Sequence, residues 1–116
     1  MTIFQLSVDA YIADPLCGFT CTAAFYRDLA CGGVEVGRSE TFAATPVDLP
    51  ILVVSGSADP VGRGGAGVRE VVTAYRRAGV REVSLRLYPG ARHELLNETN
   101  REQATADLLV WVGAHV

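Results

Sequence analysis

The sequence contains no lysine: all ten of its cationic residues are arginines, and they are scattered along the chain instead of clustering. Thirteen acidic residues give the chain a net charge of −3 at pH 7. Nucleic-acid-binding domains usually present a concentrated basic patch to the phosphate backbone. The scattered cations and the acidic balance therefore disfavour a nucleic-acid partner.

Long apolar runs are also missing, and no stretch approaches the roughly 20 residues that a helix needs to cross a membrane. The first cation in the chain is Arg27, so the N-terminal segment lacks the basic region that opens a secretory signal. The sequence predicts neither a transmembrane helix nor a signal peptide. We therefore expect a cytoplasmic protein.

Cysteine is scarce, with only Cys17, Cys21 and Cys31 present. An odd number of cysteines in a chain without an export signal argues against a disulfide framework. Together with His93 the three thiols could form a zinc site, but their spacing matches none of the paired Cys-x-x-Cys patterns. We favour the interpretation that they are small buried apolar residues.

With 116 residues, 49% of them hydrophobic, the chain is long enough for one small globular domain. The organisation changes after residue 45. The first part predicts short amphipathic helices over residues 7–14 and 20–30, then a loop or linker over residues 31–48. The signals for regular structure are stronger in the second part.

Residues 46–116 predict an α/β architecture, a parallel β-α-β-α unit. The segment "LPILVVSG" (49–56) is a continuous apolar, β-branched run typical of a central strand buried on both faces. Valines recur with helical spacing over residues 65–80, and Gly79 lies where a helix C-terminus favours glycine. The segment "EVSLRLY" (82–88) alternates apolar and polar residues, as expected of a strand nearer the sheet edge.

A last helix is expected after the second strand. Thr99 and Glu102 have the spacing of a capping box, which favours a helix that begins at this point. Trp111 would lie on the core side of that helix. We expect His115 to be a frayed terminal residue.

Each predicted strand is followed by a residue that can take part in proton transfer: Asp59 after the first strand and His93 after the second. Functional groups collect at the carboxyl ends of parallel strands, and one crossover makes the two loops neighbours. A carboxylate beside an imidazole can fix its tautomer and stabilise the imidazolium. We predict an acid–base pair, although each residue taken singly is more often a turn residue or a solvated side chain.

A second interpretation comes from "GRGGAG" (62–67), which fits the dinucleotide-binding pattern G-x-G-x-x-G before a helix. The fit is weak, because five residues separate these glycines from the end of the strand and the second strand ends in Tyr88-Pro89 without a ribose-binding acid. Glycines that let a helix pack closely are the preferred explanation. We therefore expect no nicotinamide or flavin cofactor.

The segments "LPILVVSGSADPVG" and "YPGARHELLNETNR", with the trailing "DLLVWV", resemble the C-terminal half of the α/β-hydrolase fold. The branch they resemble contains lysophospholipases, monoacylglycerol lipases and serine aminopeptidase-like hydrolases. The segment "YIADPLCGFTCTAAFYRDL" is similar to the helical cap that such proteins insert before their last two strands. The resemblance implies a partial cap and linker over residues 1–45 and a C-terminal hydrolase portion over residues 46–116.

The resemblance also implies roles for individual residues. Asp59 matches the triad acid of the family, and His93 matches its triad base. Glu94 is a rival for a chemical role, but adjacent side chains usually point apart, so we interpret it as structural. The residues expected to buttress the histidine loop are Asn97, Glu98 and Arg101.

The serine nucleophile of this family is missing from the sequence. The chain has no G-x-S-x-G motif, and Ser57 and Ser39 lack the flanking glycines. In the order of the family, the serine would precede the cap, in sequence before Met1. The resemblance therefore implies a fragment or truncated form of a serine hydrolase that acts on carboxylic esters without a cofactor and is inactive alone.

Three further expectations follow from this incomplete resemblance. The substrate of the complete enzyme would be a small lipid or ester, such as a monoacylglycerol or a lysophospholipid. The strand over residues 49–56 would lack one neighbour, and its apolar edge favours self-association. The alternative function is a non-catalytic α/β interaction module, a remnant hydrolase whose cap and sheet edge bind a partner.

Overall fold

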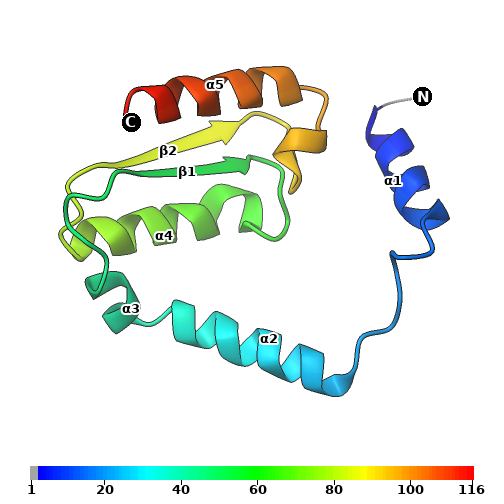
Figure 1. Cartoon of the computed structure of the whole chain (residues 1–116), viewed down its shortest axis with the longest axis horizontal. Helices are drawn as coiled ribbons and strands as arrows, with labels where there is room; N and C mark the ends of the chain where they lie inside the picture. Colours follow the sequence, from blue (N-terminus) through cyan, green and yellow to red (C-terminus); the bar gives the residue numbers. More distant parts are fainter. Residues whose placement is uncertain (1–2) are drawn as a thin grey trace.

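A computed structural model describes residues 3–116 of the chain, with side chains from residue 8 onward. Helices come first in the sequence, and a unit of strands and helices follows them (Figure 1). In chain order the elements are α1 (Ile3–Ala13), α2 (Ala23–Val36), α3 (Ser39–Ala43), β1 (Ile51–Gly56), the 3₁₀ turn η1 (Arg63–Gly65), α4 (Ala66–Arg77), β2 (Val83–Tyr88), the 3₁₀ turn η2 (Leu95–Asn97) and α5 (Arg101–Gly113).

Strands β1 and β2 pair in parallel, from Ile51 opposite Val83 to Gly56 opposite Tyr88. Helix α4 connects them, and Figure 1 shows α4 on one face of the sheet and α5 on the other. The predicted α/β class and β-α-β-α order are confirmed. The strand expected to be central has only one neighbouring strand among the described residues, and its first four residues are only partly buried.

The two faces of the sheet bury separate apolar clusters, as the alternation of β2 predicts. On the α4 side, Val83 packs with Val72 and Val80. On the α5 side, Tyr88 packs with Ala104 and other small or apolar residues. Because successive side chains of a strand point to opposite faces, β2 contributes to both clusters.

The polar side chains of β2 lie under α5 and are bonded to it. The Tyr88 hydroxyl donates a hydrogen bond to Asp107 of α5 (3.0 Å), and Arg86 forms an ion pair with the same carboxylate (2.8 Å). Burial, followed by the hydrogen bond to Asp107, raises the pKa of Tyr88, so the phenol stays protonated and remains a donor. This network fixes α5 over the sheet.

Helix α4 ends as its sequence predicts. Gly79 has a positive φ of 94°. Its N–H donates to the carbonyl of Arg76 (3.1 Å), and the N–H of Val80 donates to that of Tyr75 (3.2 Å). These two bonds form a Schellman motif, in which glycine avoids the strain of the left-handed conformation.

The expected loop over residues 31–48 is wrong. Helix α2 continues to Val36 and α3 follows over Ser39–Ala43. Thr22 caps α2 by accepting the N–H of Phe25, and the two glycines inside the helix destabilise it by only about 1 kcal/mol each relative to alanine. Within residues 3–116, no helix is long and apolar enough to cross a membrane.

The expected capping box is also wrong. Helix α5 begins at Arg101, and the preceding residue is Asn100, whose side chain makes no capping bond. The turn η2 sets the helix entry instead, since the N–H of Arg101 donates to the carbonyl of Glu98 (3.2 Å). A bond between backbone groups here replaces the side-chain cap that the sequence suggested.

His115 is not a frayed residue, contrary to the prediction. Its Nδ1 lies 2.6 Å from the carbonyl oxygen of Trp111, and its Nε2 lies 2.7 Å from a carboxylate oxygen of Glu82. The imidazole also stacks on the Trp111 ring at 4.2 Å, and only 19% of its side chain is exposed. Trp111 itself is only partly buried, so it holds the chain end more than it fills the core.

Both ring nitrogens of His115 face oxygen acceptors, which favours the doubly protonated ring. The Trp111 carbonyl, followed by Glu82, raises the pKa of His115 above its ordinary value of about 6.5. Because the folded-state pKa is raised, protonation of His115 stabilises the folded state fully below about pH 6.5. This contribution to the free energy of unfolding is lost as the pH rises through the folded-state pKa.

We predict that the free energy of unfolding decreases between pH 6 and pH 9 more in the wild type than in His115→Gln. Glutamine keeps a donor in this position but does not titrate. Urea unfolding followed by circular dichroism at each pH measures the difference. Parallel pH profiles for the two proteins would contradict this assignment.

The end of β1 passes directly beneath the loop that follows β2. A Cβ atom placed on Gly56 would lie 2.0 Å from the carbonyl oxygen of Ala91 and 2.3 Å from that of Arg92. No side chain fits there unless the backbone moves, because normal contacts between non-bonded atoms are above 3 Å. Glycine at position 56 therefore permits the loop to cross the strand end.

We predict that Gly56→Ala lowers the free energy of unfolding by about 1–3 kcal/mol, since overpacking at a rigid contact displaces backbone. Urea unfolding monitored by circular dichroism measures the change. Gly33→Ala is the control: nothing lies within 4 Å of its added Cβ, and alanine favours the helix there. Equal stability of Gly56→Ala and wild type would contradict the close approach.

Candidate acid–base site

The candidate site lies at the carboxyl ends of both strands, where the β1–α4 loop carries Asp59 and the β2–α5 loop carries His93. Hydrogen bonds join the two loops. The N–H of Ser57 donates to the carbonyl of Tyr88, and the N–H of Ala58 donates to that of Ala91 (both 2.9 Å). The two loops are therefore neighbours, as one crossover connection predicts.

Asp59 and His93 are hydrogen-bonded to each other. Nδ1 of His93 lies 3.1 Å from Oδ2 of Asp59. The other carboxylate oxygen of Asp59 accepts the N–H of Val61 at 2.9 Å. Asp59 is only 5% exposed, whereas 63% of the His93 side chain is exposed. A buried carboxylate thus holds one edge of an imidazole whose ring is largely open to solvent.

The bonds to its carboxylate keep Asp59 ionised. The hydrogen bond from His93 is the largest cause that lowers the pKa of Asp59, and the N–H groups of Val61 and Gly62 add to it, while burial acts in the opposite direction. An ionised carboxylate can only accept, so the proton must be on Nδ1 of His93. In the neutral form of this ring Nε2 carries the lone pair, which is the form that a general base requires.

The glycine-rich segment packs around this pair. A Cβ atom on Gly62 would lie 3.3 Å from both Oδ2 of Asp59 and Oγ of Ser55, and one on Gly65 would lie 3.1 Å from Leu87. Gly62 therefore leaves room for the buried carboxylate, and Gly65 lets the entry of α4 approach β2. Close packing, the preferred explanation for this segment over a dinucleotide site, agrees with these contacts.

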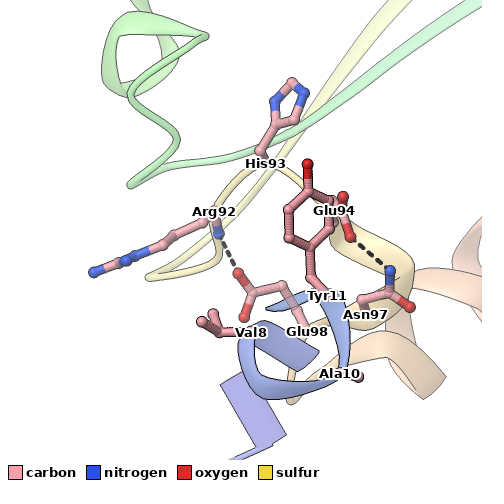
Figure 2. Close-up of a pocket in the computed structure, with 8 residues that line it drawn as sticks. All are labelled: Val8, Ala10, Tyr11, Arg92, His93, Glu94, Asn97 and Glu98. Carbon is pink, nitrogen blue, oxygen red and sulfur yellow. Dashed lines mark hydrogen bonds between the residues drawn. The ribbon is translucent and has the colours of Figure 1, made fainter. Parts of the chain in front are cut away.

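His93 also lines an open pocket of about 560 Å³ (Figure 2). Helix α1 forms one wall with Val8, Ala10 and Tyr11, and the histidine loop forms the other. The hydroxyl of Tyr11 accepts the N–H of Gly18 (3.2 Å), which ties the wall to the turn after α1. The pocket therefore lies between helix α1 and the loop that carries His93.

The loop around His93 is braced by its own polar side chains (Figure 2). Glu98 accepts the backbone N–H of Arg92, the residue before His93, at 2.7 Å. Asn97 donates to the exposed carboxylate of Glu94, also at 2.7 Å. Asn97 and Glu98 thus make contacts of the expected buttressing kind. Arg101 is exposed, and the bond that links it to this loop comes from its backbone.

The two serines considered from the sequence are engaged elsewhere. The hydroxyl of Ser57 accepts the N–H of Gly90 (2.9 Å), and the hydroxyl of Ser39 bonds its neighbour Glu40 (3.2 Å). Neither hydroxyl is hydrogen-bonded to His93. Ser57 instead helps to hold the two loops of the site together.

The conceivable zinc site does not form among the described residues, since no three His, Cys, Asp or Glu side chains gather into a group that could hold a metal ion. Cys17 and Cys21 are half-buried and Cys31 is exposed, and all three are free thiols. The expectation that they are small buried apolar residues is therefore wrong for the exposed Cys31, and Cys17 and Cys21 are only partly buried. The short helices around them bury too little surface.

Sequence reasoning missed the residues that make the pair possible. Gly56 and Gly62 act by having no side chain, and Val61 acts through its backbone N–H. Only one signal pointed to this role: the glycine at the end of a continuous apolar strand, where a second chain segment can approach closely.

Comparison with known proteins gives a consistent result. The family model described as "Serine aminopeptidase, S33" matches residues 3–100. A monoacylglycerol lipase of Mycolicibacterium smegmatis is 32% identical over 112 residues, which is 94% of this chain and 36% of the relative. The chain thus spans about a third of the length of that relative.

Among solved structures, a highly thermostable carboxyl esterase from Bacillus coagulans, determined in complex with glycerol, is similar to this chain with a TM-score of 0.81 and 26% identity. The similarity covers 95% of this chain and 36% of the esterase. The predicted resemblance to the α/β-hydrolase fold is confirmed. The chain belongs to the serine aminopeptidase S33 family of α/β-hydrolases.

Proposed function

We propose that Asp59 and His93 are the acid and the base of a serine hydrolase that cleaves the carboxylic ester of a monoacylglycerol or lysophospholipid. One observation carries the proposal. A buried, ionised carboxylate accepts Nδ1–H of a largely exposed imidazole, and His93 lines an open pocket. This is the arrangement in which an acid orients a general base for nucleophilic catalysis.

In the complete enzyme, Nε2 of His93 takes the hydroxyl proton of the attacking serine as the new bond to the ester carbonyl forms. The imidazolium then returns this proton to the leaving alcohol as the ester bond breaks. Water repeats the sequence on the acyl-enzyme: His93 removes its proton and returns one to the serine. Asp59 stays ionised throughout and stabilises the imidazolium.

The serine must come from sequence outside these 116 residues, because the chain has no G-x-S-x-G. We propose that the chain is a fragment or truncated form of the enzyme and does not hydrolyse esters alone. Loss of the serine nucleophile lowers kcat by roughly 10⁶-fold in a serine protease that uses the same triad of side chains. The names of the two similar proteins, a monoacylglycerol lipase and a carboxyl esterase, support an ester substrate.

Replacing the matched third of the M. smegmatis lipase by this chain should give a chimera that a fluorophosphonate probe labels and that hydrolyses monoacylglycerol. His93→Ala in the chimera should lower kcat by roughly 10⁵-fold or more, and Asp59→Asn by roughly 10⁴-fold, because each removes a triad function. Steady-state kinetics with a monoacylglycerol ester measures both effects.

Glu102→Gln is the control for these variants. It removes an exposed charge in the first turn of α5, outside the pocket and the histidine loop, and it should leave kcat within a few-fold of the parent chimera. The isolated chain should show no specific labelling by the fluorophosphonate probe. Specific labelling is the labelling that heat denaturation abolishes. A chimera that is fully active with His93→Ala would refute the assignment of the base.

We further propose that the isolated chain self-associates through β1. Its residues Ile51–Val54 are apolar and only partly buried, and an uncharged strand edge pairs readily with another chain. Sedimentation analysis should show an average mass that rises with protein concentration. A monodisperse monomer that melts cooperatively across the same concentrations would contradict this proposal.

A further inference from the structure

Two backbone hydrogen bonds run between the loop after β1 and the loop after β2. The N–H of Ser57 donates to the carbonyl of Tyr88, and the N–H of Ala58 donates to that of Ala91 (both 2.9 Å). The residue that follows Ala58 is Asp59, so these bonds lead directly to the acid of the candidate pair. The backbones of the two loops are therefore paired up to the position of the acid.

A third hydrogen bond between the loops uses a side chain. The hydroxyl of Ser57 accepts the N–H of Gly90 at 2.9 Å. Ser57 therefore makes two of these three bonds, one through its own N–H and one through its hydroxyl. A substitution by alanine would remove the bond of the hydroxyl and leave the backbone bond in place.

The N–H of Gly90 belongs to the turn that opens the histidine loop. Residues 88–91 form a β-turn in which the N–H of Ala91 donates to the carbonyl of Tyr88 (3.3 Å). Pro89 in the second position and Gly90, with a φ of 72°, in the third are typical of a type II turn. The bond within the turn leaves the N–H of Gly90 without an acceptor there, and the Ser57 hydroxyl supplies one.

This turn determines where the chain begins its path from β2 to His93. Only two residues, Ala91 and Arg92, separate the glycine of the turn from the histidine. The carbonyl groups of both lie against Gly56, where no side chain fits. Because each residue has only two soft backbone dihedrals, so short a segment passes a displacement of Gly90 on to the imidazole.

The hydrogen bond of the acid–base pair tolerates little displacement. Nδ1 of His93 lies 3.1 Å from Oδ2 of Asp59, close to the upper limit of about 3.2 Å for a hydrogen bond between nitrogen and oxygen. Since 63% of the His93 side chain is exposed, packing alone does not fix the orientation of the ring. The alignment of the base therefore depends on where the backbone of the histidine loop is held.

We propose that Ser57 is a positioning residue for the general base: its hydroxyl holds the turn at Gly90, so that His93 stays aligned with Asp59. This role rests on the proposed function, in which His93 is the base. Ser57 acts through the backbone of the other loop and does not touch the reacting atoms. Loss of its hydroxyl lowers kcat, because proton transfer requires a base that is held within hydrogen-bond reach of the proton it takes.

Ser57→Ala and Ser57→Thr form a matched pair for the isolated chain, since only threonine keeps the hydroxyl. Hydrogen–deuterium exchange of the Gly90 amide should be at least about tenfold faster in Ser57→Ala than in the wild type, whereas the amide of Ala58 should stay protected. The pKa of Asp59, measured by NMR titration of its carboxyl carbon, should rise toward its ordinary value of 3.8 in Ser57→Ala, because the bond from His93 that lowers it is weakened. Threonine should restore both properties.

In the chimera with the M. smegmatis lipase, Ser57→Ala should lower kcat for a monoacylglycerol roughly 3- to 10-fold with KM unchanged, the factor expected for one neutral hydrogen bond. A double-mutant cycle separates positioning from stability. In the Asp59→Asn chimera, the same substitution should change kcat less than about twofold, because the alignment is already lost. Ser39→Ala is the control: it removes a hydroxyl that bonds its neighbour Glu40, and it should leave kcat within about twofold in both backgrounds.

The remaining outcomes separate the role of Ser57 from the proposed function. An equal loss of kcat in the Asp59→Asn background would assign Ser57 a structural role only. Faster exchange of the Gly90 amide with either an unchanged pKa of Asp59 or an unchanged kcat would show that the hydroxyl braces the turn without positioning the base. In a chimera that hydrolyses no ester, the proposed function fails, and the Asp59 titration alone decides whether Ser57 positions the imidazole.

Discussion

The contact between Gly56 and the backbone of Ala91 and Arg92 determines the rest of the site. The loop after β2 can cross the end of β1 only because position 56 has no side chain. That crossing brings Nδ1 of His93 to 3.1 Å from a carboxylate oxygen of Asp59, which lies on the loop after β1. The acid–base pair thus depends on backbone packing at the strand ends. Asp59 and His93 can form their hydrogen bond because Gly56 has no side chain.

Burial and hydrogen bonding act in opposite directions on Asp59, and the balance between them sets the chemistry. Burial alone would raise the pKa of the carboxyl and neutralise it. The bonds from His93, Val61 and Gly62 outweigh burial and lower the pKa. The absence of a side chain at Gly62 leaves room for the carboxylate beside these donors. The glycine-rich entry to α4 therefore supports the charge of Asp59 through packing and backbone donors.

The sequence predicted the parts of the molecule that depend on local pattern and chain order. The apolar run of β1, the alternation of β2 and the Gly79 helix end each follow from one local rule. The neighbouring positions of Asp59 and His93 follow from the handedness of one crossover. The anchoring of His115 was not predictable, because Glu82 lies far from it in sequence. The continuation of α2 through two glycines was missed because low propensity lowers helix stability without forbidding a helix.

The largely exposed imidazole of His93 and the outer edge of β1 are linked by the same crossing loop. Ala91 and Arg92 cross the end of β1 above Gly56, so the loop that carries His93 lies over a strand whose outer edge has no neighbouring strand among the described residues. A chain that pairs with this edge, as in the self-association proposed for β1, would bury the apolar edge and exclude water near His93, which strengthens the electrostatic interactions of the imidazole. The stability of β1 and the environment of the candidate base would then depend on the same backbone hydrogen bonds.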